Sequence, residues 1–119
     1  MALSQPYSSA TLTVSTTELS LISGNSTLQS STTAGIYQVF LDLSALAAGD
    51  AFRLRIKEVV VSGGTQRIIL DETFAPNGGG FATPNYASPA LQLMNGWDVT
   101  VIKNDGTDRI IPYSIRQVA

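Results

Sequence analysis

The sequence predicts an all-β fold: a single antiparallel β-sandwich of jelly-roll or immunoglobulin-like topology, with about seven or eight strands. Three observations predict it. Short runs of alternating apolar and polar residues recur along the chain, and turn signals rich in Gly, Asn and Asp separate them. Charged residues make up only 13% of the chain, so uncharged polar residues must cover much of its surface, as is typical of β-rich proteins. The 119 residues fit one domain with one core.

The beginning of the chain is rich in Ser and Thr. We expect a polar N-terminal arm at about residues 1–9. Within residues 10–22, Leu12 and Val14 alternate with polar residues, which favours edge strands with a polar outer face over a solvated segment. Residues 26–33 are predicted to form a loop.

The first strong strand is predicted at residues 35–43. Its two faces are both substantially apolar, with Ile36 and Phe40 on one and the other lined by Tyr37, Val39, Leu41 and Leu43. A strand of this kind is expected to lie centrally, between two layers. Residues 44–48 are too few for a stable helix, and we expect a single helical turn that ends at Gly49-Asp50.

Residues 51–61 and 66–74 are predicted to form a hairpin. A two-residue loop at Gly63-Gly64 would place apolar residues opposite charged ones on the same face. A three-residue loop instead places Ile56 opposite Leu70 and Arg55 opposite Asp71, and a five-residue loop also keeps the two faces separate. The sequence therefore predicts a loop of three or five residues.

Residues 75–89 are predicted to form a long, weakly structured loop, and such loops are usually functional or mobile. Strands are expected at residues 90–94 and 97–103. The turn signal at residues 104–107, of the Asp-Gly kind, predicts a hairpin with a final strand at residues 108–118.

Pro112 cannot donate to a strand ladder, so one side of the final strand is expected to be an edge or a gap. Both faces of the predicted last hairpin are apolar: Trp97, Val99, Val101 and Ile110 on one, and Ile102, Ile111, Tyr113 and Ile115 on the other. A second apolar face needs a cover, and another subunit is the simplest one. We therefore predict a homo-oligomer with an interface at Ile102, Ile111, Tyr113 and Ile115.

The composition argues against several classes of function. The chain has no Cys and no His, the residues that most often supply nucleophiles, general bases and metal ligands, so we expect no enzyme and no cofactor. Seven basic residues against nine acidic ones do not form the basic patch that nucleic acid requires. No apolar run approaches the length of a membrane span, and the first residues do not have the pattern of a signal peptide.

Individual motifs favour structural roles over chemistry. Asp71 and Glu72 point to opposite faces of a strand, so salt bridges to the basic strand before them are favoured over a catalytic pair. Asp98, Asp105 and Asp108 do not complete a calcium motif. The glycines at 78–80 are not followed by a helix or a Lys, which favours a flexible hinge or a contact loop over an anion site. Trp97 is predicted in the core.

From Gly35 onward the chain resembles small tailed-bacteriophage virion structural proteins of the capsid-decoration (cement) type. The motifs that carry the resemblance lie at residues 43–50, 52–58, 62–66, 96–100, 104–107 and 111–116. The resemblance is one of pattern, and the Ser- and Thr-rich start of the chain is not part of it.

The resemblance implies a β-sandwich that oligomerises, often as a trimer, on the surface of the capsid after assembly in the bacterial host cytoplasm. Its partner would be the major capsid protein, and its role would be to bridge neighbouring capsid subunits. We expect partner contacts from the arm and the long loop, at Pro6, Tyr7, Asn77, Phe81 and Tyr86. The alternative is a receptor- or glycan-binding module of a tail fibre or adhesin, which an accessible Tyr86 or Trp97 would favour.

Overall fold

The computed structural model describes residues 3–77, 80–81 and 83–118, and all regular elements in these ranges are strands. In chain order they are β1 (Ser4–Ser9), β2 (Thr13–Val14), β3 (Leu19–Ser20), β4 (Gly35–Asp42), β5 (Ala51–Val59), β6 (Gln66–Phe74), β7 (Asn85–Ala87), β8 (Leu91–Leu93), β9 (Asp98–Asp105), β10 (Arg109–Ile110) and β11 (Tyr113–Gln117). All pairings between them are antiparallel. The predicted all-β fold is confirmed.

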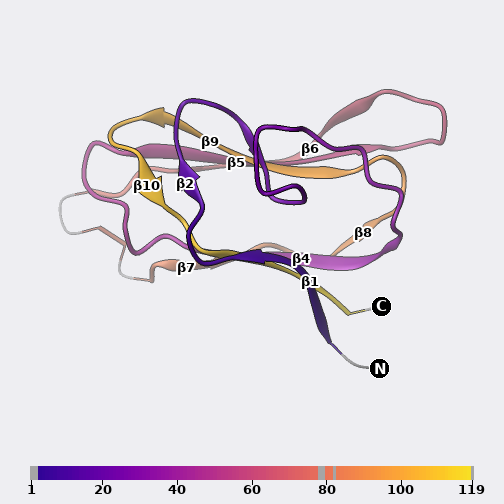
Figure 1. Cartoon of the computed structure of the whole chain (residues 1–119), viewed down its shortest axis with the longest axis horizontal. Helices are drawn as coiled ribbons and strands as arrows, with labels where there is room; N and C mark the ends of the chain where they lie inside the picture. The colour runs from indigo at the N-terminus through magenta and orange to yellow at the C-terminus, as the bar shows by residue number, and fades with distance from the viewer. Residues whose placement is uncertain (1–2, 78–79, 82, 119) are drawn as a thin grey trace.

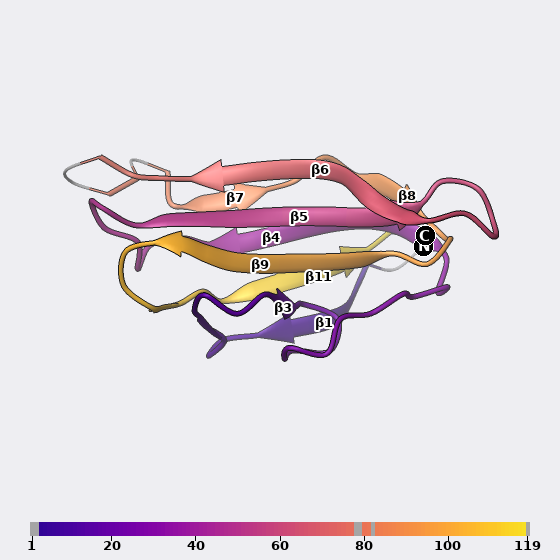
Figure 2. The ribbon, with the colours of Figure 1, turned by 90° about the horizontal axis from the view of Figure 1, so that it is seen from above.

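The strands form two facing layers (Figure 1). The β4 sheet has the order β1-β11-β4-β7, with β8 also paired to β4. The β5 sheet has the order β3-β9-β5-β6, and β2 and β10 form a separate short ribbon. Figure 2 shows the two sheets from above, with their strands running along the long axis of the molecule.

The pairing is nested. The first strand pairs with the last (β1 with β11), β3 with β9, β4 with β7 and β8, and β5 with β6. The chain is therefore one long hairpin, with its bend between β5 and β6, rolled into two layers. This is the jelly-roll arrangement, one of the two topologies expected from the sequence.

The core lies between the two sheets and is centred on Trp97, which is fully buried as predicted. The indole ring contacts Tyr37 with ring centroids 4.5 Å apart, and its Nε1 donates a hydrogen bond to the carbonyl of Thr33 at 3.0 Å. This bond satisfies the one polar atom of a side chain that otherwise contributes only apolar burial. Each sheet adds alternate side chains of its strands: Tyr37, Val39, Leu41 and Ile115 from one, and Phe52, Leu54, Ile56, Val99 and Val101 from the other.

The register of β5 and β6 partly matches the prediction. Ile56 faces Leu70 and Arg55 faces Asp71, as a three-residue loop requires. The register then shifts after Ile56, so that Lys57 faces Ile68. The bulge takes up one extra β6 residue, Ile69, and the pairing ends at Val59 and Gln66, so the loop spans residues 60–65 rather than three or five residues.

The predicted hairpin of residues 97–103 with 108–118 is wrong. β9 pairs with β3 and β5, whereas β11 pairs with β1 and β4 in the opposite sheet. The turn signal at residues 104–107 is real, but the chain uses it to cross between the layers. Pro112 lies between β10 and β11, which confirms the expected gap at this proline.

This crossing also overturns the predicted oligomer interface. Ile111, Tyr113 and Ile115 are 2%, 7% and 0% exposed because all three face the core, the last two from β11, and only Ile102 stays partly exposed. The two apolar faces of the predicted hairpin are thus two sides of one core. No second subunit is needed to cover them.

Three local expectations also change. Residues 4–9 are not a free arm, because they form β1. Within β1, Tyr7 pairs with Ile115 and its ring lies edge-on to Trp97, and these contacts hold the polar segment on the sheet. Residues 44–48 form turns rather than a helical turn. The predicted loop at residues 75–89 contains β7; its Gly78, Gly79 and Ala82 lie outside the described residues.

The strand at residues 35–42 is central in its sheet, between β11 and the pair β7 and β8. Its inner side chains are buried, but in the part of the chain that the structure describes no second layer covers its outer face, where Ile36 and Phe40 are half-buried. The expectation of a strand between two layers is therefore wrong for this face. Arg116 from β11 provides partial cover, as described below.

Asp50 fixes the crossing between the sheets. Its buried carboxylate accepts hydrogen bonds from the backbone amides of Ala47 (2.8 Å) and Thr107 (3.0 Å), and from Nε of Arg109 at 2.8 Å. Burial alone would raise the pKa of Asp50, but these hydrogen bonds and the charge of Arg109 lower it. Gly106 has a φ of +92° and lies so close to Asp50 that a Cβ would clash with its carboxylate, so this turn requires glycine.

We predict that Asp50→Ala lowers the free energy of unfolding by about 2–4 kcal/mol, because Arg109 and two amides lose their acceptor. The matched control is Asp108→Ala, which breaks the more exposed Lys103–Asp108 pair and is expected to cost less than about 1 kcal/mol. Urea unfolding of both variants measures the difference. Equal losses would show that Asp50 does not fix the crossing.

The stabilisation by Asp50 also depends on pH. Because its pKa is lowered in the folded state, this contribution is complete above the ordinary value of about 3.8 and is lost as the pH falls toward the lower folded-state pKa. The difference in stability between the wild type and Asp50→Asn is therefore predicted to shrink below about pH 4. Urea unfolding at a series of pH values tests this, and a difference that is constant with pH would contradict it.

Candidate functional surfaces

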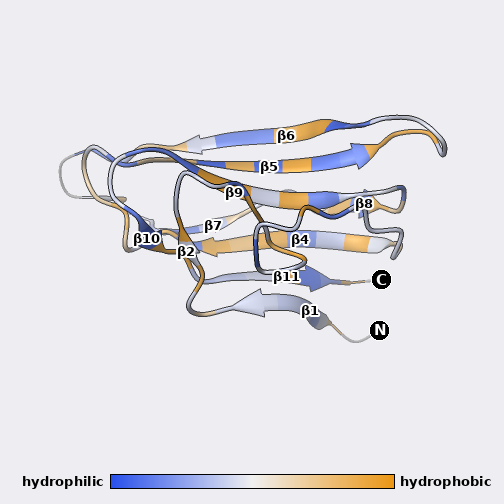
Figure 3. Ribbon diagram, turned by 45° about the horizontal axis from the view of Figure 1, so that its top comes forward, coloured by the Kyte–Doolittle hydropathy of each residue, from blue (hydrophilic) through white to orange (hydrophobic). Residues whose placement is uncertain are grey.

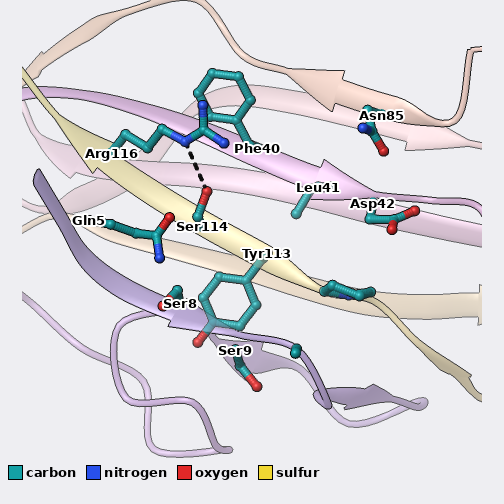
Figure 4. Close-up of a pocket in the computed structure, with 12 residues that line it drawn as sticks. Gln5, Ser8, Ser9, Phe40, Leu41, Asp42, Asn85, Tyr113, Ser114 and Arg116 are labelled. Atoms are coloured by element: carbon teal, nitrogen blue, oxygen red, sulfur yellow. Dashed lines mark hydrogen bonds between the residues drawn. The ribbon is translucent and has the colours of Figure 1, made fainter. Parts of the chain in front are cut away.

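A polar groove of about 370 Å³ lies on the outer face of the β4 sheet. Strands β1, β11 and β4 form its floor, and Asn85 of β7 closes one side (Figure 4). Its lining mixes polar and apolar surface: it includes Gln5, Ser8, Ser9, Asp42, Asn85, Ser114 and Arg116, with Phe40 and Tyr113 as its aromatic residues. Phe40, Ser114 and Arg116 reach the groove because they alternate along their strands with side chains that face the core.

Arg116 dominates the charge of this groove. Its guanidinium carbon lies 3.8 Å from the centre of the Phe40 ring, and its Nε donates to Oγ of Ser114 at 3.2 Å. This stacking orients the guanidinium and leaves its terminal nitrogens available to an acceptor such as a carboxylate. Asp42 lies farther along the same groove, where hydrogen bonds from Ser44 lower its pKa.

A second surface is apolar and lies at one end of the sandwich. We call it the hairpin end and define it by Leu3, Val60, Val61, Met94 and Val118. These side chains are 74%, 74%, 70%, 57% and 37% exposed. The β5–β6 loop, the turn after β8 and both chain termini all lie at this end (Figures 1 and 2).

The loop between β5 and β6 projects beyond the rest of the molecule at this end (Figure 2), and apolar residues follow directly after β5 (Figure 3). Glu58 ties the neighbouring turn to the hairpin, because its Oε2 accepts from the amides of Met94 at 2.7 Å and Asn95 at 3.0 Å. A small apolar hollow of about 190 Å³ continues the surface beside Met94, lined also by Ala34, Gly35, Ile36, Gln92 and Leu93. Exposed apolar side chains from four segments thus lie at the hairpin end, and Glu58 fixes the turn after β8 to β5.

The outer face of the β5 sheet is an ionic surface. Oε2 of Glu18 accepts from Thr100 at 2.6 Å, Lys57 at 3.0 Å and Arg55 at 3.4 Å. Burial would raise the pKa of Glu18, but these hydrogen bonds and charges lower it. The predicted salt bridge of Asp71 is confirmed and joins it to Arg53. The two carboxylates, Glu18 and Asp71, thus balance most of the positive charge of Arg53, Arg55 and Lys57 on this face.

Asp98 attaches the loop after β3 to this sheet. Its carboxylate accepts from Oγ of Ser20 at 2.7 Å and from the amide of Gln29 at 2.9 Å. Burial raises the pKa of Asp98 more than its hydrogen bonds lower it. Within the described ranges no three acidic side chains come together as a metal site, and Asp98 is far from the turn that holds Asp105 and Asp108 in the fold.

The five residues predicted to contact a partner do not form one surface. Pro6 and Asn77 are exposed, whereas Tyr7, Phe81 and Tyr86 are half-buried and pack against the core. Tyr86 lies edge-on to Phe74, with ring centroids 4.9 Å apart. Burial raises the pKa of Tyr86, and so does Glu72. Neither Trp97 nor Tyr86 offers the open ring on which the glycan-binding alternative depended.

Sequence reasoning missed the hairpin end, although a signal was present. Val59, Val60 and Val61 precede the turn at residues 62–65, and three successive β-branched residues leave at least one on the solvent side of a hairpin. The remaining members could not be found this way, because Leu3, Met94 and Val118 join the surface only through the rolled fold.

No model of a known protein family matches the sequence, and a search of the curated proteins finds no match either. No helix in the described part of the chain is long and apolar enough to span a membrane. The function is therefore inferred from the surfaces described above and from the resemblance in the sequence.

We predict that Ile115→Ala lowers the free energy of unfolding by about 2–4 kcal/mol through the cavity it leaves in the core. Ile102→Ala, at the partly exposed member of the same predicted interface, is the control and is expected to cost about 1 kcal/mol or less. Denaturant unfolding measures both. If Ile115→Ala left the stability unchanged, the placement of β11 against the core would be wrong.

Proposed function

We propose that the chain is a non-enzymatic structural protein of a virus particle, a capsid-decoration protein that bridges neighbouring capsid subunits. The observation that carries the proposal is the hairpin end. Val60 and Val61 are 74% and 70% exposed on a projecting loop. Exposure of such apolar side chains to water is energetically unfavourable for a free protein and is typical of a site that another macromolecule covers.

The shape of the molecule supports this role. Its extents are 43 × 31 × 21 Å, and the apolar surface is at one end of the long axis. A rigid β-sandwich that inserts such an end between two subunits resists their separation without any chemistry. Jelly rolls serve in viral capsids and also in lectins, so the fold agrees with the proposal but does not select it.

The resemblance to decoration proteins supports the partner, the major capsid protein, and the location on the capsid surface. The contact proposed is at the hairpin end, whereas the connection from β6 to β7, which contains Asn77 and Phe81, lies at the opposite end of the sandwich (Figure 1). Because the five side chains that define the hairpin end are apolar, binding through them is expected to persist at high salt.

The test is a sedimentation gradient of purified virus particles from the source, with the fractions analysed by mass spectrometry. We predict recovery of the chain in the capsid peak at hundreds of copies per particle. A few copies per particle would indicate a tail or portal position, and absence from the particle would overturn the proposal.

A matched pair of variants locates the contact. Val60→Ser with Val61→Ser is expected to reduce recovery with particles at least tenfold, while leaving the unfolding transition nearly unchanged, because these side chains are exposed. The control is Ile110→Ser, at a residue that is 47% exposed near the opposite end. Equal recovery of the two proteins would exclude the hairpin end as the contact.

A further inference from the structure

Strand β6 is an open edge of the β5 sheet. It is the terminal strand in the order β3-β9-β5-β6 and runs for nine residues without a proline. The terminal strand β1 of the other sheet differs, because it carries Pro6 and its register is interrupted between Ser4 and Tyr7. Proline and an irregular register are devices that prevent edge-to-edge pairing. The chain protects one long edge and leaves most of the other open.

The backbone groups that β6 offers to a partner can be identified. Val59 donates its amide to the carbonyl of Asn95, on the side of β9, so it forms no ladder bond with its neighbour Gln66. In an antiparallel ladder, the amide and carbonyl of Gln66 then point away from β5. Every second residue of β5 is in the same position as Val59, and the β6 residues opposite these positions are Ile68, Asp71 and Thr73. Their backbone amides and carbonyls therefore also point away from β5.

These outward groups match those of a second copy in one antiparallel register. If Ile68 faces Asp71 of the other copy, then Gln66 faces Thr73. Each residue whose backbone amide and carbonyl point outward then faces a residue of the other copy whose backbone groups also point outward. Arg67 then faces Glu72, and the two-fold axis passes between Ile69 and Leu70. The bulge lies on the axis, so both copies bend in the same way there.

Charge supports the same register. Arg67 takes part in none of the ion pairs of the described chain, and neither does Glu72. The two-fold pairing places each beside its opposite twice, on the same face of the joined sheet. Asp71 is already neutralised by Arg53, so it brings no uncompensated charge to the contact. Ile68 and Ile69, 45% and 40% exposed in the single chain, lie at the centre.

We propose that two copies of this chain associate through their β6 edges, in the antiparallel register that sets Arg67 against Glu72, and that their β5 sheets become one continuous sheet. The contact is two-fold and gives a dimer, not the trimer implied by the resemblance. It does not depend on the proposed function, because it concerns only the edge of this sheet.

The test is sedimentation equilibrium of the full chain and of charge variants. Arg67→Glu alone and Glu72→Arg alone are each expected to raise the dimer dissociation constant by roughly tenfold or more, because each places like charges opposite twice. Together in one chain they restore opposite charges, and dimerisation is expected to recover. Arg116→Glu, on the other sheet, is the control and should leave the dimer unchanged. Failure of the double variant to recover would overturn the register.

A second measurement does not depend on affinity. The chain has no cysteine, so Arg67→Cys with Glu72→Cys in the same chain introduces the only thiols. In the proposed dimer, residues 67 and 72 of the two copies form a non-hydrogen-bonded pair, at a spacing that a disulfide can bridge. Mild oxidation is expected to give covalent dimers, and Arg67→Cys with Thr73→Cys far fewer. Equal yields, or a wild type that is monomeric at all concentrations, would refute the dimer.

Discussion

The nested pairing of strands is the constraint on which the rest of this structure depends. Because the pairing is nested, each half of the chain contributes strands to both sheets, and the core that holds Trp97 is built from both halves. Tyr7, Tyr37 and Thr33 surround this side chain from segments far apart in the chain. Asp50 and Gly106 then fix the point at which the chain crosses between the layers.

The same constraint distributes the surfaces. A rolled hairpin places the β5–β6 bend and both termini at one end of the sandwich (Figure 1), and so brings exposed apolar residues from four separate segments together. It also leaves β6 as a terminal strand, while the polar groove lies on the face of the other sheet. The exposed apolar residues, the open β6 edge and the groove therefore lie on different parts of the molecule.

Local pattern predicted most of the strands and the inner faces of β4 and β5, because alternation with a period of two reports directly which side chains are buried. It also predicted the pairing of Ile56 with Leu70, since parity fixes the register. Local pattern failed at residues 104–107, because the same turn signal can either close a hairpin or carry the chain from one sheet to the other. Which of the two occurs depends on the strands with which β9 and β11 pair, and the local sequence does not show this. The misplaced interface at Ile111, Tyr113 and Ile115 followed from that one turn.

The central claim is that the hairpin end is the surface through which this protein acts. Hydrogen–deuterium exchange of the free chain and of the chain on purified capsids tests it most directly. The account predicts slower exchange on the capsid for residues 59–66 and 93–97, with little change in the segments that contain Asn77, Phe81 and Tyr86. Protection confined to those latter segments, with the hairpin end unchanged, would contradict it.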